Sequence, residues 1–169
     1  MILSILILAL VTAERVGELA LARRNTRRLL ARGAIETGAR HYPLLVVLHG
    51  AWLAGLWLLA TNLPVDLGWL AVFLGLQVLR AWTLASLGER WTTRILTLPG
   101  EPLVRHGPYR FTSHPNYVVV VGEIAALPLV FGLPAYALVF SLLNASLLAI
   151  RISAENAALR AARSPRGYA

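Results

Sequence analysis

Five runs of apolar residues dominate the sequence and constrain its fold more than any other feature. A helix needs about 20 apolar residues to cross ~30 Å of hydrocarbon. Runs that reach or approach this length occupy residues 2–22, 42–61, 67–87, 117–133 and 134–150. Of the 169 residues, 57% are hydrophobic and only 14% are charged, unlike a soluble domain. We therefore predict an all-α integral membrane protein, a single domain with about five transmembrane helices.

The basic residues predict the orientation of these helices. All sixteen are arginines, and most lie in the connections 23–41 and 88–116 and in the tail 151–169. The connection 62–66 and the hairpin near Phe131 have no basic residue. Because positive loops remain in the cytoplasm, we predict an outside amino terminus and a cytosolic tail that forms a C-terminal helix, with both long connections cytosolic. The net charge of +8 then belongs to membrane flanks, and we expect no nucleic-acid partner.

The ends of the first and fourth apolar runs carry further signals. The first run lacks the basic residues that open a secretory signal peptide, so we expect a retained anchor helix. The steps Leu127-Pro128 and Leu133-Pro134 disfavour helix at the residue before each proline. We therefore predict a tight hairpin between the last two spans. The chain has no cysteine, which excludes disulfides, Cys-ligated metals and thiol nucleophiles.

Several polar residues lie inside the apolar runs, where they are costly and therefore mark a site or a packing contact. Under the predicted orientation nearly all of them lie at mid-membrane or in the cytoplasmic half, which predicts a polar pocket open to the cytosol. Gln77 and Arg80 share one helix face, and both pocket lining and helix–helix pairing remain open for this set. Its members are Glu14, Arg15, Glu18, His49, Gln77, Arg80, Glu123 and Asn144.

The connection 88–116 has a shape of its own. Gly88 follows the third run as a glycine helix end does, and the aromatic and β-branched residues 91–95 predict a short extended segment. Pro115 opens the next helix at its first turn and leaves His114 just outside it, facing the polar pocket. The alternative is that Tyr109, His114 and Tyr117 only anchor the chain at the headgroup level.

These motifs carry a resemblance to a known family. Gly107-Pro108-Tyr109-Arg110, His114-Pro115-Asn116-Tyr117 and Arg151 with Glu155 resemble the isoprenylcysteine carboxyl methyltransferase family. Gln77-x-x-Arg80-x-Trp82, Trp91-Thr92-Thr93 and Phe140–Ala145 are similar to its compact bacterial branch, whose members often accompany type III polyketide synthases. The resemblance implies a multi-span enzyme of the bacterial cytoplasmic membrane with a cytosolic active site. It also implies S-adenosylmethionine as the cofactor and a lipophilic acceptor taken from the bilayer.

The resemblance also implies roles for individual residues. Arg151, Glu155 and His114 are the expected catalytic residues, Arg80 and Glu123 are expected to bind the acceptor, and no metal is expected. Two departures from the family pattern stand out, because Ser113 replaces an arginine and Asn156 replaces a glutamate. The expected cofactor-binding residues are Gln77, Tyr109, His114, Pro115, Asn116, Tyr117, Arg151 and Glu155.

The chemistry leaves the acceptor open. A carboxylate needs no general base, whereas a phenol or enol must lose a proton, to His114 or Glu155. Arg151, ahead of Arg80, is the arginine we expect to pair with an anionic acceptor. Because protein prenylation is not expected in bacteria, we rank a long-chain polyketide such as an alkylpyrone or alkylresorcinol first. A prenylated carboxylate and a lipid amine follow.

Two other classes of protein are weighed against an enzyme of this kind. The first is a non-enzymatic transporter or assembly protein that uses the intramembrane charges as a relay or clamp; the two halves of the sequence show no convincing repeat to support a transporter. The second is a nicotinamide-dependent membrane reductase, and the sequence contains no glycine-rich dinucleotide fingerprint.

Overall fold

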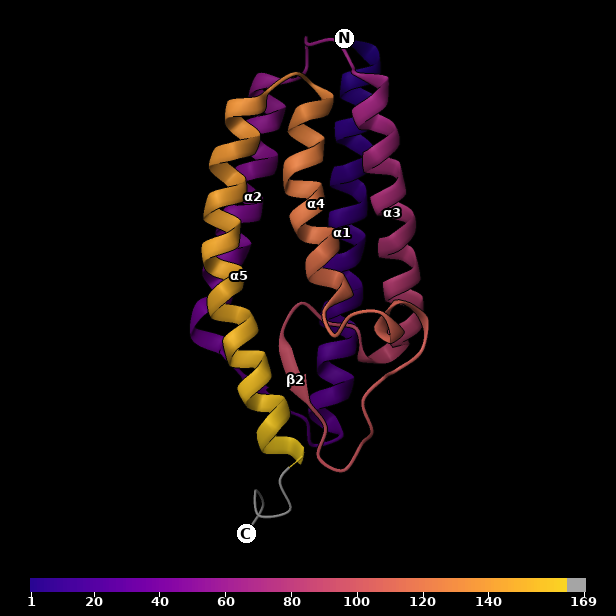
Figure 1. Ribbon diagram of the computed structural model, residues 1–169, viewed down its shortest axis with the longest axis vertical. Helices are drawn as coiled ribbons and strands as arrows, with labels where there is room; N and C mark the ends of the chain where they lie inside the picture. The colour runs from indigo at the N-terminus through magenta and orange to yellow at the C-terminus, as the bar shows by residue number, and fades with distance from the viewer. Residues whose placement is uncertain (164–169) are drawn as a thin grey trace.

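The computed structural model describes residues 1–163, and five long helices run side by side along its length (Figure 1). The all-α prediction is confirmed. The end of the predicted tail, residues 164–169, lies outside the described residues. The termini of the bundle lie at opposite ends (Figure 1), as five consecutive up-and-down helices require. The helices are α1 Ile2–Ala31, α2 Tyr42–Leu59, α3 Leu67–Leu87, α4 Pro115–Val130 and α5 Pro134–Arg163.

The outer surface of the bundle is apolar. Leu58, Val78 and Leu142 are 84%, 71% and 62% exposed, which is stable in lipid but not in water. Within residues 1–163, three helical stretches are long and apolar enough to cross a membrane: Ala39–Leu59, Leu67–Arg90 and Pro134–Arg160. The chain is therefore a membrane protein.

The other two helices fall short of that criterion. α4 is apolar but has 16 residues, and α1 has 30 residues but includes Glu14, Arg15 and Glu18. Both still pack inside the bundle beside the three longer spans (Figure 1). The number of crossings and their orientation remain predictions.

Helix ends agree with the sequence in some places and differ in others. α3 ends at Leu87 with Gly88 at a φ of 54°, and α4 begins at Pro115 directly after His114, as predicted. The tight hairpin predicted between the last two spans is confirmed, because α4 ends at Val130 and α5 begins at Pro134. The expected loss of helix at Leu127, before Pro128, is wrong. A proline in the last turn interrupts little, since the helix ends two residues later.

Two helices are longer than the predicted spans. α1 continues past residue 22 to Ala31, and α5 continues past residue 150 to Arg163. The separate cytosolic helix expected after the last span is therefore the continuation of α5. Alanine, leucine and arginine, all good helix formers, fill both extensions, and no glycine or proline interrupts them.

The connections form a small ribbon at the end of the bundle where the chain terminates in Figure 1. β1 (Ile35–Thr37) pairs antiparallel with β2 (Ile95–Thr97). The predicted extended segment 91–95 thus begins four residues too early. The side chain of Asn25 donates to the carbonyl oxygens of Gly88 (3.3 Å) and Trp91 (2.8 Å), which holds this turn against α1. Single turns of 3₁₀ helix complete the connections: η1 Ala39–His41, η2 Gly88–Arg90 and η3 Gly107–Arg110.

α4 is the central helix and packs mainly against α3 and α5. Its residues Ile124 and Leu127 are fully buried together with Leu8 of α1 and Leu56 of α2. α3 approaches α4 so closely at Gly122 that an added Cβ would lie 2.7 Å from a methyl carbon of Leu76. The middle of α4 is thus packed closely against α3.

Candidate active site

A cavity of about 1250 Å³ opens among β2, the connection that follows it, η3 and the end of α5. Tyr109 and Ser113 of the motif line it, and α5 contributes Glu155 and Asn156. A cavity of this size holds a cofactor-sized ligand with room to spare. These four positions, which the family resemblance associated with the active site, therefore face one space. Two of them, Ser113 and Asn156, are the positions where the chain departs from the family pattern.

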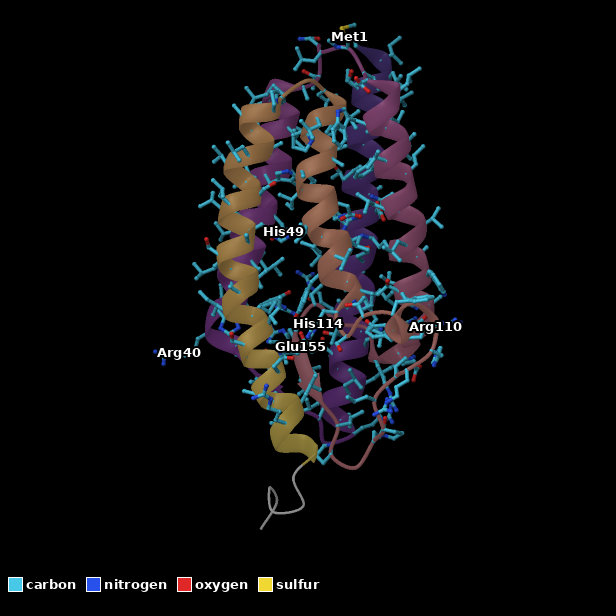
Figure 2. All side chains as sticks on the ribbon, in the orientation of Figure 1. Met1, Arg40, His49, Arg110, His114 and Glu155 are labelled. Atoms are coloured by element: carbon cyan, nitrogen blue, oxygen red, sulfur yellow. The ribbon has the colours of Figure 1, made fainter. Side chains whose placement is uncertain are left out.

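Beside this cavity, two segments that are about forty residues apart in sequence meet (Figure 2). His114, just before α4, places its Nε2 atom 3.2 Å from Oδ1 of Asn156, and its Nδ1 atom lies 3.7 Å from a carboxylate oxygen of Glu155. The imidazole stacks on the ring of Tyr117 with centroids 5.2 Å apart. The Tyr117 hydroxyl donates to Glu155. We call His114, Tyr117, Arg151, Glu155 and Asn156 the motif cluster.

Arg151 is the buried support of the motif cluster. Its side chain is 8% exposed, and Nε donates to the Tyr117 hydroxyl at 2.9 Å. Nη2 donates to the carbonyl oxygen of Thr93 at 2.7 Å, just before β2. Arg151 thereby ties α5 to α4 and to the ribbon, and it fixes the hydroxyl that contacts Glu155.

Tyr109 and Asn116 add two polar groups near the cluster. Burial, and then the negative charge of Glu155, raise the pKa of Tyr109 above its ordinary value, so its hydroxyl stays protonated at neutral pH. The Oδ1 atom of Asn116 is buried and has no hydrogen-bond partner within the described chain. An unpaired buried acceptor is costly and suits a site that a ligand donor completes.

A second group of charged residues lies in the middle of the bundle. The Arg80 guanidinium pairs with both carboxylate oxygens of Glu123 on α4, with Nε 2.7 Å from Oε1. Its remaining Nη1 atom contacts Glu18 of α1 at 3.1 Å, and the amide of Gln77 donates to Glu123 at 2.9 Å. We call Arg15, Glu18, Gln77, Arg80 and Glu123 the buried charge cluster.

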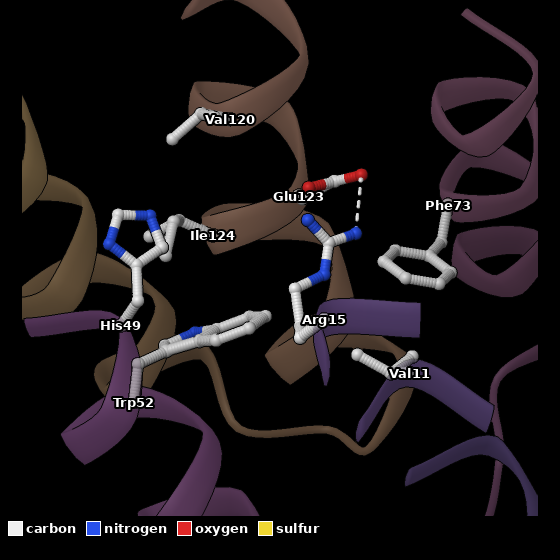
Figure 3. A pocket seen from close by; sticks show the side chains of 8 residues that line it. All are labelled: Val11, Arg15, His49, Trp52, Phe73, Val120, Glu123 and Ile124. Carbon is white, nitrogen blue, oxygen red and sulfur yellow. Dashed lines mark hydrogen bonds and ion pairs between the residues drawn. The ribbon is translucent and has the colours of Figure 1, made fainter. Parts of the chain in front are cut away.

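Arg15 extends this cluster toward α2 (Figure 3). It contacts Glu18 at 2.8 Å and Glu123 at 3.5 Å. Next to it, His49 and Trp52 of α2 border a void of about 10 Å³, which has room for about one water molecule. This void is too small for a cofactor or a lipid.

The structure therefore divides the predicted site residues between two places. Tyr109, His114, Pro115, Asn116, Tyr117, Arg151 and Glu155 gather at the cavity end of the bundle. Gln77, Arg80 and Glu123 lie together in the buried charge cluster. Gln77 was expected among the cofactor-binding residues, but its amide nitrogen donates to Glu123, and it is absent from the described lining of the large cavity. Its Oε1 atom is buried without a hydrogen-bond partner among the described residues.

Sequence reasoning missed some of the residues around the large cavity. Arg105, Arg110 and Arg160 line it, although none of them was predicted as a site residue and Arg110 appeared only within the motif that carries the family resemblance. The carbonyl oxygen of Thr93 as the partner of Arg151 was also missed. The many arginines around the motif were the one sequence signal that could have indicated these cavity residues. Which backbone oxygen accepts from Arg151, and which side chains line the cavity, depend on tertiary contacts.

Comparison with known proteins now identifies the class of protein. The model of the isoprenylcysteine carboxyl methyltransferase (ICMT) family matches residues 69–161, which include α4, the motif and most of α3 and α5. The chain belongs to this family of membrane methyltransferases. No solved structure matches it.

Two bacterial relatives extend the similarity over nearly the whole chain. The uncharacterized protein YpbQ of Bacillus subtilis (strain 168) is 41% identical over 160 residues, covering 92% of this chain and 95% of YpbQ. An uncharacterized protein of Haemophilus influenzae is 29% identical over 166 residues, covering 89% of this chain and 91% of the relative. Since both matches extend beyond residues 69–161, α1 and α2 are part of the shared architecture.

Proposed function

We propose that this protein is an integral membrane O-methyltransferase that uses S-adenosylmethionine and methylates a lipophilic acceptor. The observation that supports it best is the motif cluster, where His114, Tyr117 and Glu155 meet beside the large cavity. Family membership supports methyl transfer at a membrane. The acceptor we favour is a long-chain polyketide phenol or enol, such as an alkylpyrone or alkylresorcinol.

The residues around the cavity fit the proposed cofactor. S-adenosylmethionine supplies a methyl group already activated by a sulfonium, so neither a metal nor a covalent enzyme intermediate is needed. Glu155 in the cavity lining presents an acceptor for an ammonium group, and the imidazole of His114 lies beside it. The unpaired Oδ1 of Asn116, two residues further along the chain, is a buried acceptor near them. The ring of Tyr109 can lie beside a cation. Pro115 shapes the turn that carries these groups.

The protein's own contribution is positioning and proton transfer. Holding two reacting groups in a near-attack arrangement contributes about 7–11 kcal/mol to lowering a barrier, and Arg151 and Tyr117 fix Glu155 for this purpose. A phenol or enol must lose its proton, and His114 Nδ1 and the Glu155 carboxylate, 3.7 Å apart, are the two bases that can take it. Asn156 holds the other ring nitrogen of His114.

Cofactor binding is the first test. Calorimetric titration of the detergent-purified protein with S-adenosylmethionine or its demethylated product should show saturable binding. His114→Ala and Glu155→Gln should both weaken it, whereas Glu89→Gln, a change of an exposed ion pair with Arg28, should not. A folded protein that binds neither compound would contradict the proposal and favour the alternative, a non-enzymatic transporter or assembly protein.

Acceptor identity needs a second test. Labelled cofactor is incubated with the protein and each of three acceptors: an alkylpyrone or alkylresorcinol, a prenylated cysteine carboxylate, and a lipid amine. We expect label in the polyketide. Label in the prenylated carboxylate would establish the runner-up, and a cofactor-binding protein that labels none of the three would rule out the polyketide assignment.

A further inference from the structure

The two arginines that the sequence offered for an anionic acceptor are already occupied in the fold. Arg80 pairs with Glu123 and Glu18, and Arg151 donates to Tyr117 and to the Thr93 carbonyl oxygen. Neither is among the residues that line the large cavity within the described chain. If an anionic group binds there, other residues must recognise it.

Three other arginines meet this requirement. Arg105, Arg110 and Arg160 line the cavity from the connection after β2, from η3 and from the end of α5. Among the described residues none of the three has a carboxylate partner, and the guanidinium of Arg110 lies over the ring of Phe111. We call these three residues the basic rim.

The remaining charged residues of the cavity are largely neutralised. Arg90 pairs with Glu101, and Arg94 pairs with Glu36 at 2.8 Å. Glu155 therefore remains as the carboxylate of the described lining that has no arginine partner. The cavity as a whole carries an excess of positive charge.

The proposed cofactor does not account for this charge. With a sulfonium, an ammonium and one carboxylate, S-adenosylmethionine is itself a net cation and is repelled by extra arginines. The preference of arginine for cytosolic loops explains its abundance in this connection, but not its convergence on one cavity. The cavity is also larger than one cofactor-sized ligand requires, so a second ligand has room.

The rest of the lining indicates the character of that second ligand. Leucine side chains also line the cavity, among them Leu29, Leu96, Leu103 and Leu159. An apolar wall with a basic rim matches an amphiphile, whose chain packs on the leucines while its head group meets the guanidinium forks. Arginine binds oxyanions such as phosphate and carboxylate through paired hydrogen bonds.

We propose that Arg105, Arg110 and Arg160 form a subsite for the oxyanionic head group of the methyl acceptor. The inference rests on the proposed function for its acceptor, and it narrows that acceptor to amphiphiles that carry a negative charge when they bind. Such an acceptor needs no general base, and a neutral alkylresorcinol no longer belongs to the set. An acidic enol, a carboxylate and a phosphate share this chemistry. A neutral lipid alcohol does not.

The test compares two matched probes on the full-length protein in neutral-detergent micelles. Dodecyl phosphate and dodecanol have the same chain and differ in the head group. Titration should show dodecyl phosphate binding about tenfold more tightly than dodecanol. The triple change Arg105→Gln, Arg110→Gln and Arg160→Gln should abolish this preference.

A matched triple variant separates the subsite from general electrostatic attraction. Arg23, Arg24 and Arg27 are exposed on α1 and lie outside the described cavity lining, so changing all three to Gln removes the same charge elsewhere. This variant should keep the preference for dodecyl phosphate. Equal binding of the two probes, or equal loss in both triple variants, would overturn the proposal.

Two further readings identify the source of the head group. In nanodiscs that contain phosphatidylglycerol, dodecyl phosphate should still bind, and an added alkylpyrone should compete with it. Displacement by phosphatidylglycerol would assign the rim to bilayer lipid and refute an acceptor subsite. The basic-rim variant should also retain affinity for the demethylated cofactor. Failure of the unaltered protein to bind that compound would count against the proposed function, independently of the dodecyl phosphate result.

Discussion

The buried charge cluster and the motif cluster contain similar residue types but differ in how much of their bonding capacity the fold uses. The side chains of Arg80 and Glu123 are 5% and 6% exposed and pair through both carboxylate oxygens. Those of His114 and Glu155 are 18% and 27% exposed and lie beside the large cavity. Saturated charges of the first kind hold helices together, whereas partly open groups of the second kind can bind a ligand.

The largest expected effect comes from breaking the buried charge cluster. Arg80→Met leaves the carboxylates of Glu123 and Glu18 without their main partner, and removing one member of a buried pair costs about 3–5 kcal/mol. The free energy of unfolding in detergent should fall by that amount, with the cofactor affinity of the folded fraction unchanged.

The double variant Arg80→Met/Glu123→Met is the control, because it removes both charges and should cost less than the single change. If Arg80→Met left stability unaltered but abolished acceptor binding, the buried charge cluster would be a binding site and not a structural one. That result would return Arg80 and Glu123 to the acceptor-binding role predicted from the sequence.

The next effect is on the motif cluster, where Glu155→Gln removes a charge from the cavity wall. A hydrogen bond to a charged group contributes about 1.5–3 kcal/mol, so affinity for the demethylated cofactor should fall roughly 10-fold to 100-fold. Stability should change by less than about 1 kcal/mol. A loss of stability as large as that of Arg80→Met would show that Glu155 is also structural.

Tyr117→Phe should affect both stability and cofactor affinity, each to a smaller extent than the variants above. It removes the hydroxyl that donates to Glu155 and accepts from Arg151 but keeps the ring that stacks on His114. We expect a loss of about 1 kcal/mol in stability and a smaller loss of cofactor affinity than Glu155→Gln causes. Unfolding and calorimetry on the same sample measure both. An unchanged affinity would mean that Tyr117 does not position Glu155.

The smallest expected effect concerns Tyr109 and alkaline pH. Burial and the nearby charge of Glu155 raise its pKa above the ordinary value of 10.0. Above that pH the unfolded chain loses the phenolic proton while the folded protein keeps it, so stability falls as the pH rises. Below it, Tyr109 contributes no pH dependence. Tyr109→Phe should therefore lose less stability between pH ~9 and ~11 than the unaltered protein, as measured by unfolding across that range.

The sequence predicted the membrane class and much of the local structure, because these depend on short-range patterns. Apolar runs of helical length, the glycine after Leu87 and the proline after His114 all gave correct helix positions. A helix after the last span was expected, but its continuity with α5 up to Arg163 was missed, since hydropathy reports where a membrane ends and not where a helix ends. β1 was missed because its three residues are too few to show the alternation of apolar and polar side chains that predicts a strand.

The candidate site was predicted in composition but not in arrangement. Motif residues near position 114 and residues near 155 were assigned to one site through a family resemblance, and in the structure they meet through contacts such as His114 with Asn156. Gln77 was grouped with them, yet its amide belongs to the buried charge cluster. A sequence shows which side chains could pair but not which partner each one takes.

By itself, the sequence determined that this chain enters a membrane as a helical bundle, because burying apolar runs outweighs every other contribution at that scale. The motif of residues 105–117 determined the family resemblance. Only the tertiary structure decided which arginines are occupied and which remain available at the large cavity. That distinction depends on distances between helices far apart in the chain, and a hydrogen bond forms or fails within a few tenths of an ångström.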